Sequence, residues 1–345
     1  MSKAALHQSI RNQSFLLKEW IAGGIAALML TLALAGLWLA FTRSIWLVFA
    51  LGGVVAVGLL LPFFAAMPVL HPRRIRVSQT PADFGIARWE NVNFLAADGV
   101  QLRGWFIPPA SSTDGPTIVF VHGLGGNRGE LLPEAAMLAR AGYGALLFDL
   151  RNHGRSRGTL TTLGFREVED VRGAVAYLEM RGDVNRARIG LFGHSMGAAT
   201  VVRAAARLAQ VRVVIAQGAY SSLEENIARG VIAQAGLPPF IFAPLMIWLG
   251  ERATGLRVNQ VRPIDDVASI APRALLLIHG MRDSVVTVEN SRRLYHAANE
   301  PKELFLVNAA QHKTPMFASP SEYEKRVTDF LAVHLRGDRV VQPGI

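Results

Sequence analysis

The chain has 345 residues, of which 51% are hydrophobic, and its formal net charge at pH 7 is +10. A chain this long and apolar can bury a substantial core, so it does not belong to the disordered proteins, which combine low hydrophobicity with high net charge. It contains no cysteine, which excludes disulfide frameworks, cysteine-ligated zinc, iron–sulfur clusters and a thiol nucleophile.

The apolar residues gather near the N-terminus. Residues 20–41 and 45–70 are two stretches without a charged side chain, separated by a turn that contains Arg43. About 20 helical residues span the hydrocarbon core of a bilayer, so each stretch is long enough to cross it. The sequence predicts a transmembrane hairpin after a cytoplasmic tail at 1–19. The alternatives are one long anchor with an interfacial segment, and a soluble protein with a buried apolar helix pair.

The flanking charges predict the orientation of this hairpin. Residues 1–76 contain seven Lys or Arg and one Glu, whereas the remaining 269 residues hold 29 basic and 25 acidic side chains. Basic residues lie in the tail and in the linker at 71–83, so the positive-inside rule puts both ends in the cytoplasm. We expect a multi-pass protein of the plasma or inner membrane whose catalytic domain faces the cytoplasm. Its charge needs no nucleic-acid partner.

Residues 84–345 have the pattern of an α/β domain. An Asp98-Gly99 turn joins two strands expected at 88–95 and 100–107, which indicates a β-hairpin. Short apolar strands then alternate with helices, a pattern typical of a mostly parallel sheet covered on both faces. The strands are expected at 117–121, 144–148, 189–192, 211–216, 274–278 and 303–307, and the helices at 130–141, 168–180, 196–208, 289–298 and 321–335.

A long insertion at about 223–263 interrupts this alternation. Its centre, residues 230–250, is apolar and contains Pro238, Pro239 and Pro244, which argue against one continuous spanning helix. Two interpretations remain open. The insertion either packs on its own domain or forms a cap over a ligand cleft, with or without contact to lipid.

The sequence Gly193-His194-Ser195-Met196-Gly197 is a G-x-S-x-G motif between a predicted strand and a predicted helix. Its glycines allow the sharp turn that lifts a serine hydroxyl above the sheet, and the helix N-terminus favours a developing negative charge. This setting indicates Ser195 as a nucleophile rather than as a turn serine without chemistry.

A serine nucleophile needs a general base and an acid that orients it, in the chain order serine, acid, histidine for this architecture. Of the nine histidines, His312 alone follows the last strand in a loop, since His296 and His334 fall in helical patterns. Asp283 follows the strand at 274–278 as Ser195 follows its own, with Glu224 as the fallback. We expect His312 as the base and Asp283 as the acid.

The oxyanion site requires two backbone N–H groups. Met196 follows the nucleophile, and Leu124 lies in the glycine-rich loop 122–126 after the strand at 117–121. This loop lacks the spacing of a phosphate-binding motif, so we expect no nucleotide cofactor, and we also expect no metal. Asp149 and Arg151, which end another strand, are expected to organise the neighbouring loops rather than to contact substrate.

Five motifs in order resemble those of the α/β-hydrolase superfamily over about residues 84–335. They are VHGLGGN at 121–127, FDLRNHGRS at 148–156, GHSMGA at 193–198, HGMRDSVV at 279–286 and the late His312. The chain looks most similar to the membrane-anchored branch near acylglycerol lipases and acyl-thioesterases. The resemblance implies Ser195, Asp283 and His312 as catalytic triad and Leu124 and Met196 as oxyanion amides. Gln311 stands where relatives usually carry glycine, which a loop tolerates unless that backbone needs a positive φ.

The sequence therefore predicts a membrane-anchored serine hydrolase of the esterase, lipase or thioesterase type (EC 3.1), which cleaves a carboxylic ester or thioester through an acyl-enzyme. Together the anchor and the apolar insertion favour a lipid-like acyl substrate. A serine peptidase or amidase on the same fold is one alternative. A non-catalytic membrane scaffold that retains the fold is the other.

Overall fold

The computed structural model describes residues 20, 23–39, 41, 44–111, 115–235 and 238–337. The contacts within the chain divide it into two compact units. The first, which we call the sheet unit, comprises His71–Leu223 and Val261–Ile345. The second, the helical unit, comprises Met1–Leu70 and Glu224–Gln260.

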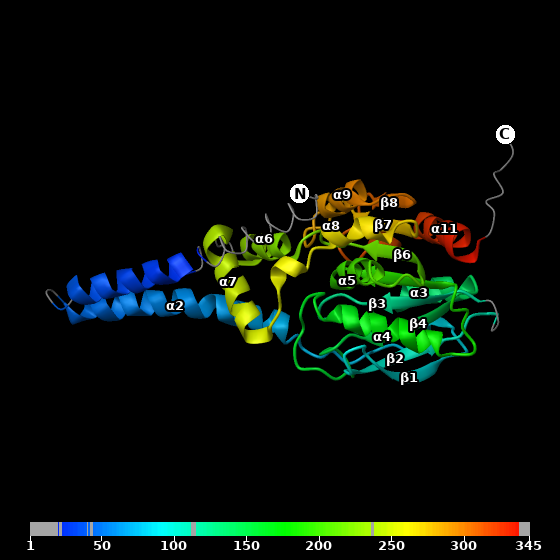
Figure 1. Cartoon of the computed structure of the whole chain (residues 1–345), viewed down its shortest axis with the longest axis horizontal. Coiled ribbons are helices and arrows are strands. Elements are labelled where there is room, and N and C mark those ends of the chain that lie inside the picture. The colour runs from blue at the N-terminus through cyan, green and yellow to red at the C-terminus, as the bar shows by residue number, and fades with distance from the viewer. Residues whose placement is uncertain are drawn as a thin grey trace, which may run out of the picture. The chain divides into compact units, whose positions relative to one another are not determined.

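An eight-stranded sheet forms the centre of the sheet unit (Figure 1). In space its strands follow the order β1-β2-β4-β3-β5-β6-β7-β8, with β1–β2 and β2–β4 antiparallel and all other neighbours parallel. The strands β3, β4 and β5 are buried along their whole length, which explains their continuous apolar sequences. The bounds are β1 Glu90–Leu95, β2 Gln101–Ile107, β3 Thr117–Val121, β4 Gly144–Asp149, β5 Ile189–His194, β6 Val211–Gln217, β7 Ala274–Gly280 and β8 Lys302–Val307.

Helices cover both faces of this sheet. On one face α3 and α11 pack in an apolar cluster with side chains of seven strands, among them Phe120, Leu147 and Leu276. On the other face α4 and α5 lie against the sheet (Figure 1). The expected mostly parallel α/β fold is confirmed. The helices of this unit are α3 Leu132–Arg140, α4 Glu167–Glu179, α5 Met196–Ala205, α8 Pro263–Asp266, α9 Val288–Ala297, α10 Pro315–Ala318 and α11 Pro320–Leu331, which continues as a π-helical turn, Ala332–Arg336.

The strands β1 and β2 form the expected hairpin. Gly99 has a φ of 87°, a left-handed conformation that glycine adopts without steric cost. The antiparallel register pairs Asn91 with Trp105 and Asn93 with Arg103. Because directly opposite residues point to the same face of a sheet, these four side chains share one face of the hairpin.

The helical unit contains an antiparallel pair of helices. Residues 23–39 are helical and lie against α2, Ile45–Leu70. Gly36 adjoins Leu51, and Gly58 adjoins Met29. The insertion contributes α6, Leu223–Ala235, and α7, Pro239–Thr254, and α7 is in contact with α2. Most of the insertion thus forms one unit with the N-terminal residues.

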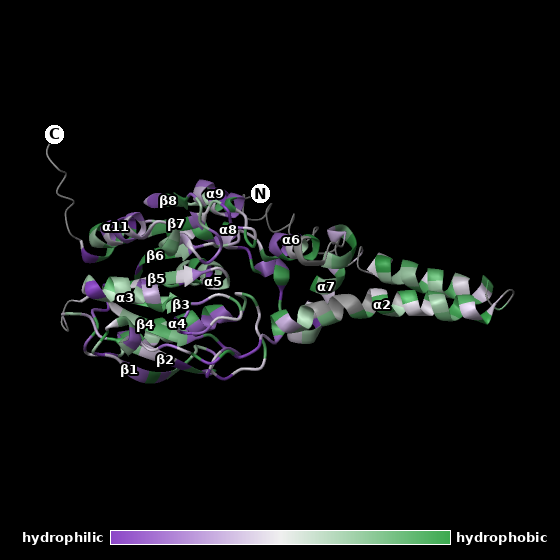
Figure 2. Cartoon of the chain, turned by 180° about the vertical axis from the view of Figure 1, so that it is seen from behind, coloured by the Kyte–Doolittle hydropathy of each residue, from purple (hydrophilic) through white to green (hydrophobic). Residues whose placement is uncertain are grey.

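Apolar side chains dominate the surface of α2, which is coloured mainly as hydrophobic in Figure 2. Trp46, Phe49 and Phe64 have exposed fractions of 77%, 66% and 63%. Over the residues described, however, the chain contains no helix whose length and hydropathy suffice for crossing a bilayer. The transmembrane hairpin expected at about 20–41 and 45–70 is therefore not supported by the structure, and the tail at 1–19 lies outside the described residues.

Candidate active site

Ser195 occupies a sharp turn between β5 and α5. Its backbone has φ 54° and ψ −118°, a conformation that costs energy for any residue with a Cβ. The turn has no room for side chains at the two motif glycines: a Cβ on Gly193 would collide with the backbone of Gly197, and one on Gly197 with the carbonyl oxygen of Val121. The sequence therefore folds here into a turn that raises Ser195 at the carboxyl end of β5.

His312 lies between Ser195 and Asp283. Its Nε2 is 2.8 Å from the Ser195 hydroxyl oxygen, and its Nδ1 is 2.6 Å from Asp283 Oδ2. Asp283 follows β7 and His312 follows β8, so all three residues stand beyond the carboxyl ends of parallel strands. Since a carboxylate only accepts hydrogen bonds, Nδ1 carries the proton and Nε2 is left to accept the proton of the serine hydroxyl. The structure thus brings together the three residues that the sequence singled out.

Asp283 is held in its charged form by several donors. The N–H groups of Val285 and Val286 both donate to its Oδ1 at 2.9 Å. Burial alone would raise the pKa of Asp283, but hydrogen bonds from His279 and His312 outweigh burial and hold the pKa below its usual range. The carboxylate is therefore a fixed acceptor for His312.

The Leu124 amide stands out within the glycine-rich loop after β3. Gly123 N–H donates to Glu130 Oε1 at 2.8 Å, and Gly125 N–H donates to His153 Nε2 at 3.1 Å. Gly126 N–H donates to the carbonyl of Gly123 at 3.1 Å. Within the described part of the chain, neither Leu124 N–H nor the N–H of Met196, at the start of α5, has a hydrogen-bond acceptor. Both amides remain available to a ligand.

A buried ion pair beside the nucleophile was not expected from the sequence. His194 Nδ1 is 2.8 Å from Glu130 Oε1, and its Nε2 is 3.0 Å from the carbonyl oxygen of His312. Burial lowers the pKa of His194, but the hydrogen bond and the charge of Glu130 more than reverse this, so the pKa is raised. The only sequence signal was a histidine within the serine motif, because Glu130 lies 64 residues away and in no recognised motif.

His153 supports the same loop in its neutral form. Its Nδ1 donates to the carbonyl of Arg151 at 2.9 Å, while its Nε2 accepts from Gly125. Burial, with the nearby His122, lowers the pKa of His153 to about 3. A neutral ring with one donor and one acceptor matches both partners.

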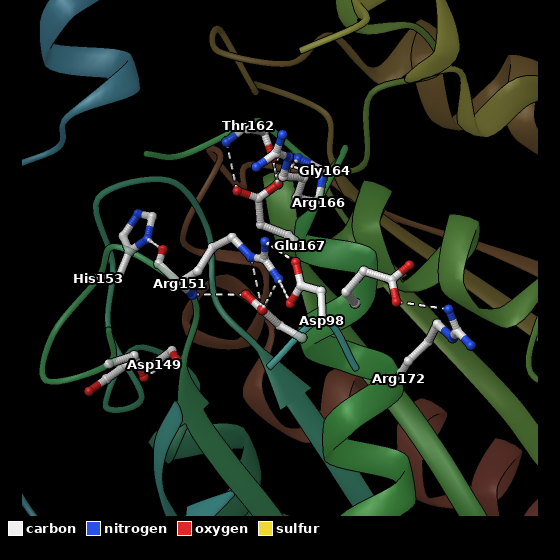
Figure 3. A network of polar contacts seen from close by, with 12 residues as sticks. Asp98, Asp149, Arg151, His153, Thr162, Gly164, Arg166, Glu167 and Arg172 are labelled. Atoms are coloured by element: carbon white, nitrogen blue, oxygen red, sulfur yellow. Dashed lines mark hydrogen bonds and ion pairs between the residues drawn. The ribbon is translucent and has the colours of Figure 1, made fainter. Parts of the chain in front are cut away.

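Asp149 and Arg151 organise loops, as the sequence indicated. The Arg151 guanidinium binds Asp170 and Asp98, with nitrogen–oxygen distances of 2.8 to 2.9 Å (Figure 3). Figure 3 also shows Glu167, whose carboxylate accepts from Thr162 and Gly164. These contacts fasten the segment after β4 to α4. They leave Arg151 occupied by two carboxylates rather than open to a substrate.

Gln311 does not require a strained backbone. Among the described residues other than glycine, a positive φ occurs at Asn152, Leu163 and Ser195, and Gln311 is not one of them. Its N–H donates to the Thr314 hydroxyl at 2.8 Å. The loop that carries His312 therefore accommodates a side chain where related sequences usually have glycine.

No cluster of three or more His, Asp or Glu residues suited to a metal ion occurs in the described part of the chain. The fallback acid Glu224 lies in α6, whereas Asp283 is in contact with His312. His296 lies in α9 and His334 in the π-helical turn, as their helical patterns indicated.

Known proteins share this fold and part of this sequence. Residues 118–344 match the model of the alpha/beta hydrolase family. The YfhR protein of Escherichia coli strain K12 is 32% identical over 251 residues, which cover 70% of this chain and 80% of that protein. The YqkD protein of Bacillus subtilis is 28% identical over 238 residues, covering 68% of this chain and 77% of that protein. An esterase of Pyrococcus furiosus, Pf2001, superposes with a TM-score of 0.65 at 28% identity, covering 77% of this chain and 98% of the esterase. The chain therefore belongs to the alpha/beta hydrolase family.

Proposed function

We propose that this hydrolase cleaves a carboxylic ester or thioester through an acyl-enzyme on Ser195. The observation that carries the proposal is the hydrogen-bonded series from Ser195 Oγ through His312 to Asp283, with distances of 2.8 and 2.6 Å. Such a series activates a serine that is otherwise a weak nucleophile. The free amides of Leu124 and Met196 supply donors for an oxyanion, and their location beside the serine motif supports the same assignment.

The reaction then proceeds in two halves. His312 Nε2 takes the proton of the Ser195 hydroxyl as Oγ bonds to the carbonyl carbon, and the N–H groups of Leu124 and Met196 stabilise the resulting oxyanion. The bond to the alcohol or thiol breaks, and that leaving group takes the proton from His312. Water next gives its proton to His312 and attacks the acyl carbon, which releases the acid and returns the proton to Ser195. One oxyanion donor typically contributes about 3 kcal/mol of transition-state stabilisation.

The esterase structure from Pyrococcus furiosus supports an ester as the substrate class. The apolar surface of the helical unit favours lipid-like acyl groups. The five motifs support a place near the acylglycerol lipases and acyl-thioesterases. A series of p-nitrophenyl esters from acetyl to palmitoyl, with matched acyl thioesters, tests this. We expect the highest kcat/KM for the longer acyl chains, and an optimum at acetyl would contradict a lipid-like substrate.

We also propose that residues 20–70 attach the enzyme to the plasma or inner membrane, with the catalytic unit on the cytoplasmic side. The charge-free stretches and the basic residues on both flanks support this, as do the exposed apolar side chains of α2. A reporter fused after Arg76 should report the cytoplasm, and the protein should stay with membranes in alkaline carbonate. Release by carbonate would contradict the attachment, and a reporter on the outer side would contradict the topology.

Labelling with a fluorophosphonate probe tests the nucleophile. The wild-type protein should be labelled, and Ser195→Ala should abolish both labelling and ester hydrolysis. Ser284→Ala is the matched control, because Ser284 is an exposed serine next to Asp283 and its loss should change neither signal. Equal labelling of wild type and Ser195→Ala would refute the assignment. An unlabelled but folded wild type would favour the non-catalytic scaffold, and a preference for amide over ester substrates would favour a peptidase or amidase.

A further inference from the structure

A pocket of about 440 Å³ opens at the β1 edge of the sheet unit. Three consecutive β1 residues line it, together with one arginine from β2, one from the segment after β3 and one from the segment after β4. The lining residues are Asn91, Val92, Asn93, Arg103, Arg128 and Arg155. None of them takes part in the hydrolysis proposed above. Among the described residues the lining holds three guanidinium groups and no carboxylate.

Both asparagines present hydrogen-bond donors to this pocket. Trp105 Nε1–H donates to Asn91 Oδ1 at 3.2 Å, and the Arg103 guanidinium donates to Asn93 Oδ1. Indole and guanidinium nitrogens only donate, so the amide oxygens must face them. Each asparagine therefore keeps its NH₂ group for another partner. Donors line the pocket, and the two side-chain acceptors are already engaged.

Arg128 is buried, and its guanidinium forms an ion pair with Asp149. Its side chain is 6% exposed, and its guanidinium carbon lies 4.9 Å from the centre of the Trp105 ring. Its Nε has no hydrogen-bond partner among the described residues, since the nearest carboxylate oxygen, Asp149 Oδ2, is 3.7 Å away. Burying a charged donor without a hydrogen bond is costly, and an anion bound beside the guanidinium would reduce that cost.

Asp149 offsets only part of the positive charge of the three pocket arginines. Its carboxylate accepts the backbone N–H of Arg128 through Oδ1 and that of Arg155 through Oδ2, each at 2.8 Å, and it is fully buried. These bonds fix the two loops that present the arginines. Burial lowers the pKa of Arg128, the Asp149 carboxylate opposes this, and the like charges of the two other pocket arginines lower it further. An anion would relieve that repulsion.

We propose that this pocket binds a phosphate-type oxyanion. The planar guanidinium fork matches phosphate oxygens in a bidentate manner, and three such groups with two amide NH₂ donors suit a doubly charged group with several acceptors. The phosphate belongs either to a soluble phosphate ester or to a lipid headgroup. Binding here is independent of Ser195, so the site adds to the hydrolytic function and does not rest on it.

Titration of the full-length protein with inorganic phosphate, followed by calorimetry at low ionic strength, tests the site. We expect saturable binding in the wild type and in Ser195→Ala. Arg103→Gln and Arg155→Gln should each weaken it about tenfold or more, since each removes a charge-assisted donor. Arg157→Gln is the matched control, because Arg157 is exposed and lies two residues from Arg155 outside the lining. Circular dichroism establishes that the variants are folded.

Absence of saturable phosphate binding would overturn the proposal, as would equal weakening by Arg157→Gln or equal competition by chloride. Two further titrations distinguish the sources of phosphate. One uses glycerol 3-phosphate, and the other uses phosphatidylcholine vesicles with and without phosphatidic acid. If Arg155→Gln weakens binding of glycerol 3-phosphate only, the ligand is a soluble phosphate ester. If it weakens binding of the phosphatidic acid vesicles only, the ligand is a lipid headgroup. If Arg155→Gln binds both as the wild type does, the pocket is not a phosphate site.

Discussion

His194, the residue before the proposed nucleophile, has an acceptor on each side of its ring. Glu130 Oε1 faces Nδ1, and the carbonyl oxygen of His312 faces Nε2. Both contacts are hydrogen bonds only if both nitrogens carry protons, which makes the ring an imidazolium. Glu134, which lies on α3, and Lys313, which pairs with Glu130 at 3.5 Å, are the other titratable groups nearby. The His194–Glu130 pair therefore ties the glycine-rich loop to the loop of the proposed catalytic base.

This arrangement predicts a loss of stability and activity at alkaline pH. The pKa of His194 is raised in the folded protein, so its contribution to stability is present below the ordinary histidine pKa of about 6.5 and is lost as pH rises through the higher folded value. Glu130→Gln removes the carboxylate and should shift this loss of stability to lower pH. At pH 6 we expect the free energy of unfolding of the variant to be about 2 kcal/mol lower than that of the wild type. Thermal unfolding and kcat/KM measured against pH check it.

Lys313→Gln is the control for that experiment. Lys313 is 65% exposed, and an exposed ion pair contributes less than about 1 kcal/mol. Its pH profiles should follow those of the wild type. If the pH profiles of Glu130→Gln coincide with those of the wild type as well, His194 does not control the loss of stability and activity at alkaline pH.

At the scale of elements, the turn between β5 and α5 depends on close packing of backbone against backbone. Gly197 opens α5 directly against the end of β3, where Val121 and His122 present their carbonyl oxygens. Helix and strand approach this closely only because no Cβ intervenes. The conformation of Ser195 is imposed by the two elements that it joins.

Gly197→Ala should therefore destabilise the protein strongly. Its Cβ would meet backbone atoms that cannot rotate away, so we expect about 3 kcal/mol of lost stability and severely reduced probe labelling of Ser195. Denaturant unfolding followed by fluorescence measures the change. Gly182→Ala serves as the comparison, because a Cβ there meets nothing within 4 Å, and its midpoint should stay near that of the wild type. Similar midpoints for the two variants would show that the turn tolerates a side chain.

The catalytic residues could be predicted from the sequence because each of them follows the end of a strand. Ser195, Asp283 and His312 each follow a continuous apolar strand, and parallel strands bring their carboxyl ends to one edge of a sheet. Glu130 and Arg128 gave no such signal, since their placement depends on how the segment after β3 returns across the sheet. The segments at 20–70 illustrate the converse. Their hydropathy predicted helices, which the structure contains, but hydropathy did not predict that α7 of the insertion would contact α2.

At the scale of the whole molecule, the pH dependence of stability also involves the buried carboxyl group of Glu134. Glu134 is 5% exposed, and burial raises its pKa to about 7. An acid whose pKa is raised in the folded protein does not lower the free energy of unfolding below its ordinary pKa of about 4.3. As pH rises from there toward 7, it lowers the free energy of unfolding progressively. The fold thus becomes less stable on the alkaline side as Glu134 ionises.

Glu134→Gln should remove this penalty. At pH 8 we expect the free energy of unfolding to be on the order of 3 kcal/mol higher in the variant than in the wild type. At pH 4 the two values should differ little. Chemical unfolding at both pH values measures it, and the exposed Glu289→Gln should alter neither. A destabilised Glu134→Gln at pH 8 would show that the ionised carboxylate has a favourable partner in the fold.

The helical unit is assembled from two parts of the chain, Met1–Leu70 and Glu224–Gln260, and this has a consequence for synthesis. A ribosome completes α2 roughly 170 residues before it begins α7, an interval of about 10–30 s at ordinary elongation rates. During that time α2 lacks its later partner, while β1 to β6 are still being made. The apolar side chains of α2 are therefore accessible to other molecules before synthesis of the enzyme is complete. The order of translation thus leaves time for the membrane attachment proposed above before the sheet unit is complete.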